Sequence, residues 1–474
     1  MKRKLYHDLS VNTMQVLINQ VCGFTIFYVL SVFFSKNDFG EISWSLAVLL
    51  TAFSILSFGI DQLTVKKVAE GIDVSAILPE YIMHVLLAGS LFYGILIGIH
   101  FIFPAFHHAL LLFLGIGKLM VFFSSPFKQL TNGLERFRPL LFMSICSNVV
   151  RSVLLVAGSF YVTLTLGNVV AIFIFGDICE LVLSVIIAKK ILKVPLSISL
   201  KRWKYIALLK EALPQAGVVI FTSAIARFDW IFLGIFASNV ALAEYSFAFK
   251  AFEVASLPLL IIAPILVPRF TKQFAMASPE DAETEKNNLA NLLRFEMIIS
   301  GFLALLLNLL WIPVIDSITH NKYGFVNRNT IFILSACMPL LYLNNLLWTI
   351  SFAKGRLKMI FNVFLVTFLT NVFFDIVLIP FFGGEGAALA YLIAACVQLI
   401  LFQKGNAFFA FHKVMYPIFF CSLSALTGAL IAMQLSNNVL LLVPISIFIF
   451  MCMLIITRQI FLKDWLLIKR IAGL

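Results

Sequence analysis

The feature that most constrains this sequence is a series of long apolar segments that recurs along its 474 residues. Each segment has about 20 residues, the length at which an α-helix crosses the hydrocarbon core of a bilayer. Strands of a membrane barrel would be shorter and would alternate apolar with polar residues. The sequence therefore predicts an all-α membrane protein with fourteen transmembrane helices. The predicted helices are 12–34, 42–60, 81–103, 109–127, 139–161, 168–188, 212–236, 241–268, 292–315, 329–352, 359–379, 386–403, 414–434 and 439–457.

Charge supports this class and fixes an orientation. Only 12% of residues are charged and the mean hydropathy is +1.02, whereas soluble proteins carry about 25% charged residues. A soluble enzyme, a secreted disulfide scaffold and a disordered chain are thereby excluded. On one side of the predicted spans the loops hold only Lys36, Lys322 and Arg328, while the other side includes the cation-rich stretch 189–210. Since Lys and Arg concentrate in cytoplasmic loops, we expect a multi-pass inner-membrane protein with both termini cytoplasmic. The net charge of +12 then reflects topology and does not indicate a nucleic-acid partner.

A weak internal repeat links the two halves of the chain. Residues 40–44 (GEISW) resemble 243–247 (AEYSF), and 147–150 (SNVV) resemble 370–373 (TNVF). The matched helices run in the same direction, which is typical of the parallel repeats found in transporters. We therefore predict two six-helix repeats. The predicted regions are an N-lobe at 1–190, a cytoplasmic linker at 191–211, a C-lobe at 212–405, and two extra spans with a C-terminal interfacial helix at 406–474.

Three stretches resemble a known family. They are Phe39-Gly40 through Phe58-Gly59-Ile60-Asp61, Leu213-Pro214 through Arg227-Phe228-Asp229 to Ala243-Glu244-Tyr245-Ser246-Phe247-Ala248, and Leu378-Ile379-Pro380 with Gly383-Gly384-Glu385-Gly386-Ala387-Ala388. In order and spacing they resemble the Wzx-type flippases of lipid-linked oligosaccharides, in the multidrug/oligosaccharidyl-lipid/polysaccharide exporter superfamily.

The resemblance implies a V-shaped pair of lobes around a central cationic cavity and alternating access without ATP hydrolysis. It implies a polyprenyl-pyrophosphate-linked glycan as cargo, such as an O-antigen (lipopolysaccharide) or capsule unit, and the polysaccharide polymerase machinery as a partner. One alternative is a cation-coupled multidrug exporter of the same superfamily. Another is a membrane glycan polymerase or ligase, although such enzymes tend to carry a large outside loop, which this sequence lacks.

Four cations interrupt the predicted spans: Lys118, Arg151, Arg227 and Lys250. Each costs about 2.5–3.5 kcal/mol at the centre of a helix in lipid, so such residues normally face a wet cavity or a partner. We expect Arg151 and Arg227 to bind the pyrophosphate, because a guanidinium matches phosphate oxygens. The alternative is that each arginine forms a structural ion pair, with Asp229 or Asp375 as partners.

The other two cations allow similar alternatives. Lys250 lies three residues before Glu253, so the two side chains share a helix face. An internal ion pair is the favoured interpretation, with substrate binding as the alternative. Lys118, beside two glycines, is expected either to line the cavity or to reach a partner on a neighbouring helix.

Intramembrane acids suggest ion coupling. Asp177 and Glu180 lie three residues apart and face one way, and two close carboxylates tend to share a proton. Proton or sodium antiport through these acids or through Asp375 is one hypothesis. The alternative is that the acids pair with Lys118 or Arg151.

The first span carries a polar stripe of Asn12, Gln15 and Asn19, with Gln20 nearby. Related cell-wall precursor flippases place Arg on this span, so the chain departs from that branch here. We expect Asn12, Asn19 and Gln20 to contact sugar hydroxyls; hydrogen bonding between helices is the alternative. No nucleotide-binding, HExxH or GxSxG motif is present. The sequence predicts a transporter and no enzyme, with no metal and no cofactor apart from a coupling ion.

Overall fold

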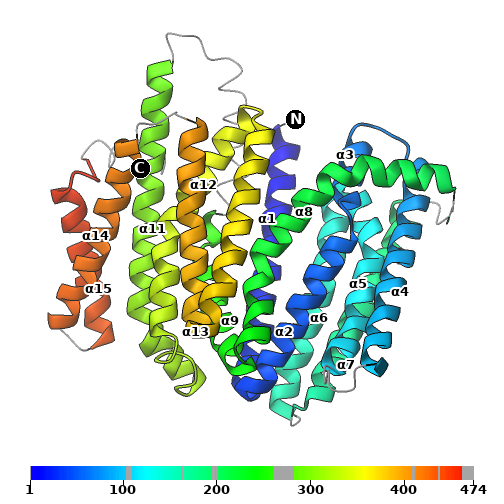
Figure 1. Cartoon of the computed structure of the whole chain (residues 1–474), viewed down its shortest axis with the longest axis horizontal. Coiled ribbons are helices and arrows are strands. Elements are labelled where there is room, and N and C mark those ends of the chain that lie inside the picture. The colour runs from blue at the N-terminus through cyan, green and yellow to red at the C-terminus, as the bar shows by residue number, and fades with distance from the viewer. Residues whose placement is uncertain are drawn as a thin grey trace. The chain divides into compact units, whose positions relative to one another are not determined.

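The computed structural model describes residues 2–102, 109–161, 164–194, 198, 201–259, 282–406, 411–435 and 438–461. In these ranges the chain is helical and contains no β-strand (Figure 1). Eleven of the described helical segments are long and apolar enough to cross a membrane. The predicted all-α membrane fold is thereby confirmed, and the chain is a multi-pass membrane protein.

Contacts between Cα atoms divide the chain into two compact units, Met1–Ala243 and Glu244–Leu474. Helix α9 (Asn239–Ala255) crosses this division. The first unit otherwise contains α1 (Lys2–Phe33), α2 (Lys36–Leu56), α3 (Ile60–Ala69), the short η1 (Val74–Ala76), α4 (Leu78–Ile102), α5 (Ala109–Gly133), α6 (Phe137–Tyr161), α7 (Leu166–Ile186), the π-helical turn η2 (Ile187–Ile191) and α8 (Arg202–Phe236). The second contains α11 (Ala282–Thr319), α12 (Arg328–Ala353), α13 (Leu357–Asn406), α14 (Phe411–Leu435) and α15 (Val439–Ile456).

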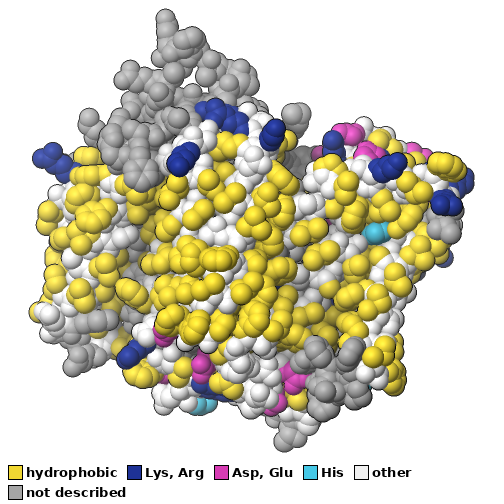
Figure 2. All heavy atoms as spheres, in the orientation of Figure 1, with side chains coloured by type: hydrophobic (Ala, Val, Ile, Leu, Met, Phe, Trp, Pro, Cys, Tyr) yellow, Lys and Arg dark blue, Asp and Glu magenta, His cyan; other side chains and the backbone are white. Residues whose placement is uncertain are grey.

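The surface matches a lipid environment. Figure 2 shows hydrophobic side chains covering the middle of the visible helices, with Lys and Arg gathered near helix ends. Large apolar side chains such as Phe101 and Phe381 are exposed to 76% and 80% of their surface. Exposed apolar surface of this kind needs hydrocarbon around it, because water would not tolerate it over so large an area.

Most predicted spans coincide with the helices found. Twelve of the fourteen fall on the eleven apolar segments, since 359–379 and 386–403 both lie on α13. The predicted span 212–236 lies on α8, and 241–268 begins on α9 and continues outside the described residues. The count of fourteen and the lobe boundaries stay predictions. The expected interfacial helix near the C-terminus also falls largely outside the described residues, which end at position 461.

The second span differs from its predicted range of 42–60. Helix α2 begins at Lys36 because the Ser35 side chain caps it, accepting a hydrogen bond from the Asp38 backbone N–H at 3.1 Å. The apolar run does not reveal this polar first turn. At the other end Phe58 and Gly59 adopt left-handed backbone angles, with φ of 52° and 72°. They end the span and redirect the chain into α3.

Two glycines permit close approach between elements of the first unit. A Cβ on Gly59 would lie 2.7 Å from Ala216 N and 2.7 Å from the Gln215 carbonyl carbon on α8. A Cβ on Gly40 would overlap the backbone of Asn239 at the start of α9. The Phe39-Gly40 and Phe58-Gly59 stretches are therefore packing sites for α9 and α8.

A third glycine divides α13. Gly383 has φ of 53° and ψ of −126°, which interrupts the helix between the two predicted spans. Three residues on, a Cβ on Gly386 would lie 2.5 Å from the Leu378 carbonyl oxygen. The glycine-rich stretch at 383–386 thus allows a tight break that residues with side chains would resist.

We expect Gly59→Ala to lower the thermal stability of the detergent-solubilised protein more than Gly71→Ala does. Both glycines have positive φ, where Ala costs roughly 1–2 kcal/mol, but only Gly59 has neighbours that a Cβ would strike. Melting monitored by size-exclusion fluorescence compares the two variants. An equal loss of thermal stability in both variants would show that the close approach of α8 to Gly59 does not add to the cost of the substitution.

Candidate functional site

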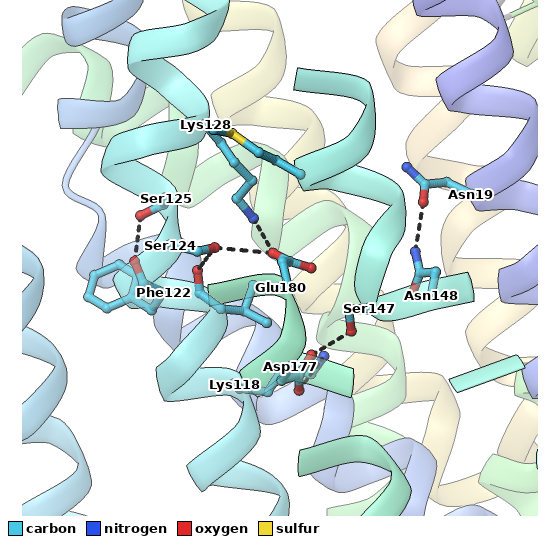
Figure 3. Close-up of polar contacts among 12 residues, drawn as sticks. Asn19, Lys118, Phe122, Ser124, Ser125, Lys128, Ser147, Asn148, Asp177 and Glu180 are labelled. Carbon is cyan, nitrogen blue, oxygen red and sulfur yellow. Dashed lines mark hydrogen bonds and ion pairs between the residues drawn. The ribbon is translucent and has the colours of Figure 1, made fainter. Parts of the chain in front are cut away.

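Charged side chains gather inside the first unit, between the spanning helices α5, α6 and α7 (Figure 3). This buried charge cluster comprises three cations, two carboxylates and two serines and carries a net charge of +1. Its members are Lys118, Ser124 and Lys128 on α5, Ser147 and Arg151 on α6, and Asp177 and Glu180 on α7.

Asp177 is the centre of the cluster. Its carboxylate forms an ion pair with the Arg151 guanidinium and accepts a 2.7 Å hydrogen bond from the Ser147 hydroxyl. Lys118 Nζ approaches the other oxygen at 3.9 Å. The Asp177 side chain is 1% exposed and that of Arg151 6%, so this pair lies out of contact with solvent or lipid.

Neighbouring residues make room for the pair. A Cβ on Gly117 would lie 2.5 Å from Asp177 Oδ2, and one on Gly176 would lie 2.9 Å from Arg151 Cγ. The Phe173 ring lies 4.4 Å from Arg151 Cζ, in cation–π geometry. Arg151 Nε has no hydrogen-bond partner among the described residues, so the guanidinium retains one unused donor.

Glu180 forms a second pair one turn along α7. Its Oε1 lies 2.6 Å from Lys128 Nζ and accepts a 3.1 Å hydrogen bond from the Ser124 hydroxyl. Figure 3 shows Lys128 and Ser124 directed towards this carboxylate, apart from the Asp177 contacts. Each acid therefore has its own cation.

The predicted pairing of the acids with Lys118 or Arg151 is confirmed for Asp177. The alternative of an ion pair at Arg151 is correct, but the partners considered for it, Asp229 and Asp375, are wrong, because Asp177 on the adjacent helix α7 occupies that place. Sequence reasoning missed Lys128. The apolar run ends at residue 127, whereas α5 continues to Gly133 and directs Lys128 to Glu180.

The other predicted residues lie elsewhere. Arg227 on α8 is half-buried, with its guanidinium carbon 4.7 Å from the centre of the Trp230 ring. Asp229 is buried and accepts a 2.8 Å hydrogen bond from the Trp230 backbone N–H. The predicted internal pair of Lys250 and Glu253 is confirmed, at 2.7 Å in the second unit.

The polar stripe of the first span divides into two kinds of residue. Asn19 accepts a 2.9 Å hydrogen bond from the Asn148 side chain on α6, which confirms hydrogen bonding between helices at this position (Figure 3). Asn12 is exposed and Gln20 half-buried. Their contact with sugar stays a prediction.

Two buried acids lie in the second unit. Asp375 on α13 is fully buried, one turn after the buried Asn371. Glu296 on α11 is 2% exposed, and neither carboxylate oxygen has a hydrogen-bond partner among the described residues. Sequence reasoning missed Glu296, although an acid inside the predicted span 292–315 was a usable signal. The described residues contain no group of three or more His, Cys, Asp or Glu able to hold a metal ion.

We expect Asp177→Asn to destabilise the protein by about 3–5 kcal/mol, because it leaves Arg151 charged and buried without its acid. Adding Arg151→Gln to this variant should restore part of the loss. Glu253→Gln is the matched control, since that pair is partly exposed and its removal should cost below about 1 kcal/mol. Thermal melting of the four proteins tests this, and a loss no greater than in the control would contradict a strong pair at Asp177.

Comparison with known proteins assigns the chain to a family. A family model described as polysaccharide biosynthesis protein matches residues 5–274, more than half of the chain. No curated protein matches the chain significantly.

Solved structures share the fold at low sequence identity. The lipid II flippase MurJ in an inward closed conformation is similar with a TM-score of 0.75 at 14% identity, covering 96% of this chain and 99% of that one. An inward-facing multidrug resistance MATE transporter of the MOP superfamily gives 0.64 at 13%, covering 83% and 97%. A MOP superfamily transporter from Pyrococcus furiosus gives 0.50 at 14%, covering 84% and 93%.

These similarities confirm the exporter-superfamily fold that the motifs indicate, whereas the O-antigen specificity is not established by them. With a family model covering residues 5–274 and a multi-pass helical fold like that of MurJ and the MATE transporters, the chain belongs to the polysaccharide biosynthesis protein family.

Proposed function

We propose that this protein flips polyprenyl-pyrophosphate-linked oligosaccharide repeat units across the bacterial inner membrane by alternating access. The observation that carries the proposal is membership in the polysaccharide biosynthesis family. It is supported by the eleven apolar segments, each long enough to cross a membrane, found among the described helices. A glycan headgroup cannot enter hydrocarbon unaided, because its hydroxyls would lose their hydrogen bonds with water. A multi-pass protein that supplies polar and cationic contacts offsets this cost.

Among the intramembrane cations, we assign the main phosphate contact to Arg227. Its side chain is half-buried and so remains accessible to a ligand, whereas Arg151 lies buried against Asp177. Arg151 and Lys118 are placed in a supporting role, since their cluster keeps a net positive charge and one unused guanidinium donor. Lys250, Asn12, Asn19 and Gln20 remain further candidates for the headgroup.

A coupling ion is part of the proposal. Asp177 and Glu180 each have a cation within ion-pair distance, which disfavours a proton shared between them. We propose Asp375 as the acid that binds a proton or sodium ion, because it is fully buried on α13, one turn after the buried Asn371. Transport that persists after both gradients collapse would contradict this coupling.

A second candidate function is cation-coupled export of small molecules. It is favoured by the similarity to the MATE transporter structure and disfavoured by the excess of cations over acids in the buried charge cluster, because MATE cargo is usually cationic. Drug susceptibility of a strain lacking the protein separates the two. Sensitisation to cationic drugs with normal surface polysaccharide would favour the exporter.

Deleting the gene should cause the undecaprenyl-linked repeat unit to accumulate on the cytoplasmic leaflet, because synthesis continues while translocation stops. Extraction of lipid-linked intermediates, with a periplasmic glycosidase to score sidedness, measures this. Plasmid-borne wild-type protein should restore normal levels. If the distribution of the repeat unit between the two leaflets were the same with and without the gene, the flippase assignment would be contradicted.

Arg227→Gln should lower flipping about 10-fold or more, since hydrogen bonds to charged groups contribute about 1.5–3 kcal/mol. Arg227→Lys should retain more activity because the positive charge remains. Arg328→Gln is the matched control: its guanidinium lies 4.7 Å from the Phe325 ring, as Arg227 lies from Trp230, but it is exposed. Uptake of a labelled lipid-linked glycan in proteoliposomes measures the rates. Normal flipping by Arg227→Gln would remove this residue from the site.

A further inference from the structure

The segment between α7 and the predicted span 212–236 on α8 forms a cationic surface that the proposed transport does not use. We call the described residues of 189–213 the basic arm. Seven exposed Lys or Arg side chains lie on it: Lys189, Lys190, Lys193, Lys201, Arg202, Lys204 and Lys210. None of the seven forms an ion pair with another described residue. Its one acid, Glu211, pairs with Lys67 of α3. The surface therefore presents a dense positive charge.

The arm is fixed against the first unit by specific contacts. Besides the pair of Lys67 and Glu211, Tyr205 lies 3.0 Å from His84 Nδ1, and His84 Nε2 lies 2.8 Å from the Leu56 carbonyl oxygen. A carbonyl only accepts, so Nε2 carries the proton and the Tyr205 hydroxyl donates to Nδ1. Burial raises the pKa of Tyr205, which keeps that donor protonated. The cations are thus held on a docked helix.

The arm also has an amphipathic face. Leu208 and Ala212 are buried against the unit, whereas Trp203 is 87% exposed and shares its face with Ala207 and Lys210. Figure 1 shows the first turns of α8 running across the ends of α3 and α4 before the helix changes direction. The arm starts within η2, in the last turn of the spanning segment that ends at Ile191, so it lies near the membrane–water interface. Trp and Lys on one exposed helix face are typical of interfacial helices.

We propose that the basic arm is a binding surface for anionic phospholipid headgroups in the leaflet on its side of the membrane. Headgroup phosphates supply the negative charge that the seven cations lack, and the Trp203 ring occupies the level between headgroups and acyl chains. A nucleic acid or an acidic protein would match the charge but would leave the exposed Trp203 without an apolar environment. This inference requires only a multi-pass membrane protein and is independent of the transported substrate.

The test measures which lipid surrounds Trp203 in the intact protein. The full chain is placed in nanodiscs containing about 25 mol % of phosphatidylglycerol or phosphatidylcholine brominated near the headgroup, in a phosphatidylcholine background. Subtracting the signal of Trp203→Phe isolates one of the six tryptophans. Brominated phosphatidylglycerol should quench Trp203 at least about twofold more than brominated phosphatidylcholine, and about 0.5 M NaCl should reduce the difference by screening.

A variant with Lys201→Gln, Arg202→Gln, Lys204→Gln and Lys210→Gln should lose the preference for phosphatidylglycerol. A control that removes four exposed cations outside the arm, through Lys66→Gln, Arg136→Gln, Lys358→Gln and Lys404→Gln, should keep it. Equal quenching by the two lipids in the wild-type protein, or equal loss in variant and control, would overturn the proposal. If the fourfold variant does not fold, the salt series on the wild-type protein tests the proposal by itself. A quenching difference between the two lipids that about 0.5 M NaCl does not reduce would then overturn it.

Discussion

The carboxylate of Asp177 holds three spanning helices of the first unit together. It lies on α7, pairs with Arg151 of α6, accepts a hydrogen bond from Ser147 and lies 3.9 Å from Lys118 of α5. In a hydrocarbon environment the apolar faces of helices gain little by association, because lipid tails are equally apolar. Charges that cannot leave the membrane therefore fix which faces meet, and the packing of α5, α6 and α7 follows from satisfying them.

Small residues make this arrangement sterically feasible. Gly117 and Gly176 leave the space that Asp177 and Arg151 fill, and Gly40 and Gly59 allow α9 and α8 to approach α2 and its end. The motifs that resemble a flippase family are therefore in part packing signatures: they position the helix that bears Arg227. The same stretch thus carries both a helix-packing contact and the arginine that we propose for substrate binding.

The functional proposal depends on how the cations divide between these two tasks. Arg151, paired with an acid and 6% exposed, contributes chiefly to the integrity of the first unit, while the half-buried Arg227 is the residue that we propose for the main phosphate contact. The cations of the basic arm are exposed at and beyond the end of a spanning segment and have no acid partners among the described residues. Three environments thus correspond to three roles for one type of charge: packing, which the ion pair shows, and the two that we propose, in transport and at the lipid surface.

The sequence by itself determined the class of protein: the length of the apolar runs predicts helices that span a bilayer, and twelve of the fourteen predicted spans coincide with them. It also supplied the pair of Lys250 and Glu253, because residues three apart on one helix must share a face. The tertiary structure chose Asp177 among the partners that the sequence left open for Arg151. It also decided the pair of Lys128 with Glu180, the early start of α2 at Lys36, and the burial of Glu296 with no hydrogen-bond partner among the described residues. Hydropathy depends on composition along one helix, whereas an ion pair between helices depends on which of their faces meet. Those faces are set by the rotation of each helix about its axis, which no local sequence pattern encodes.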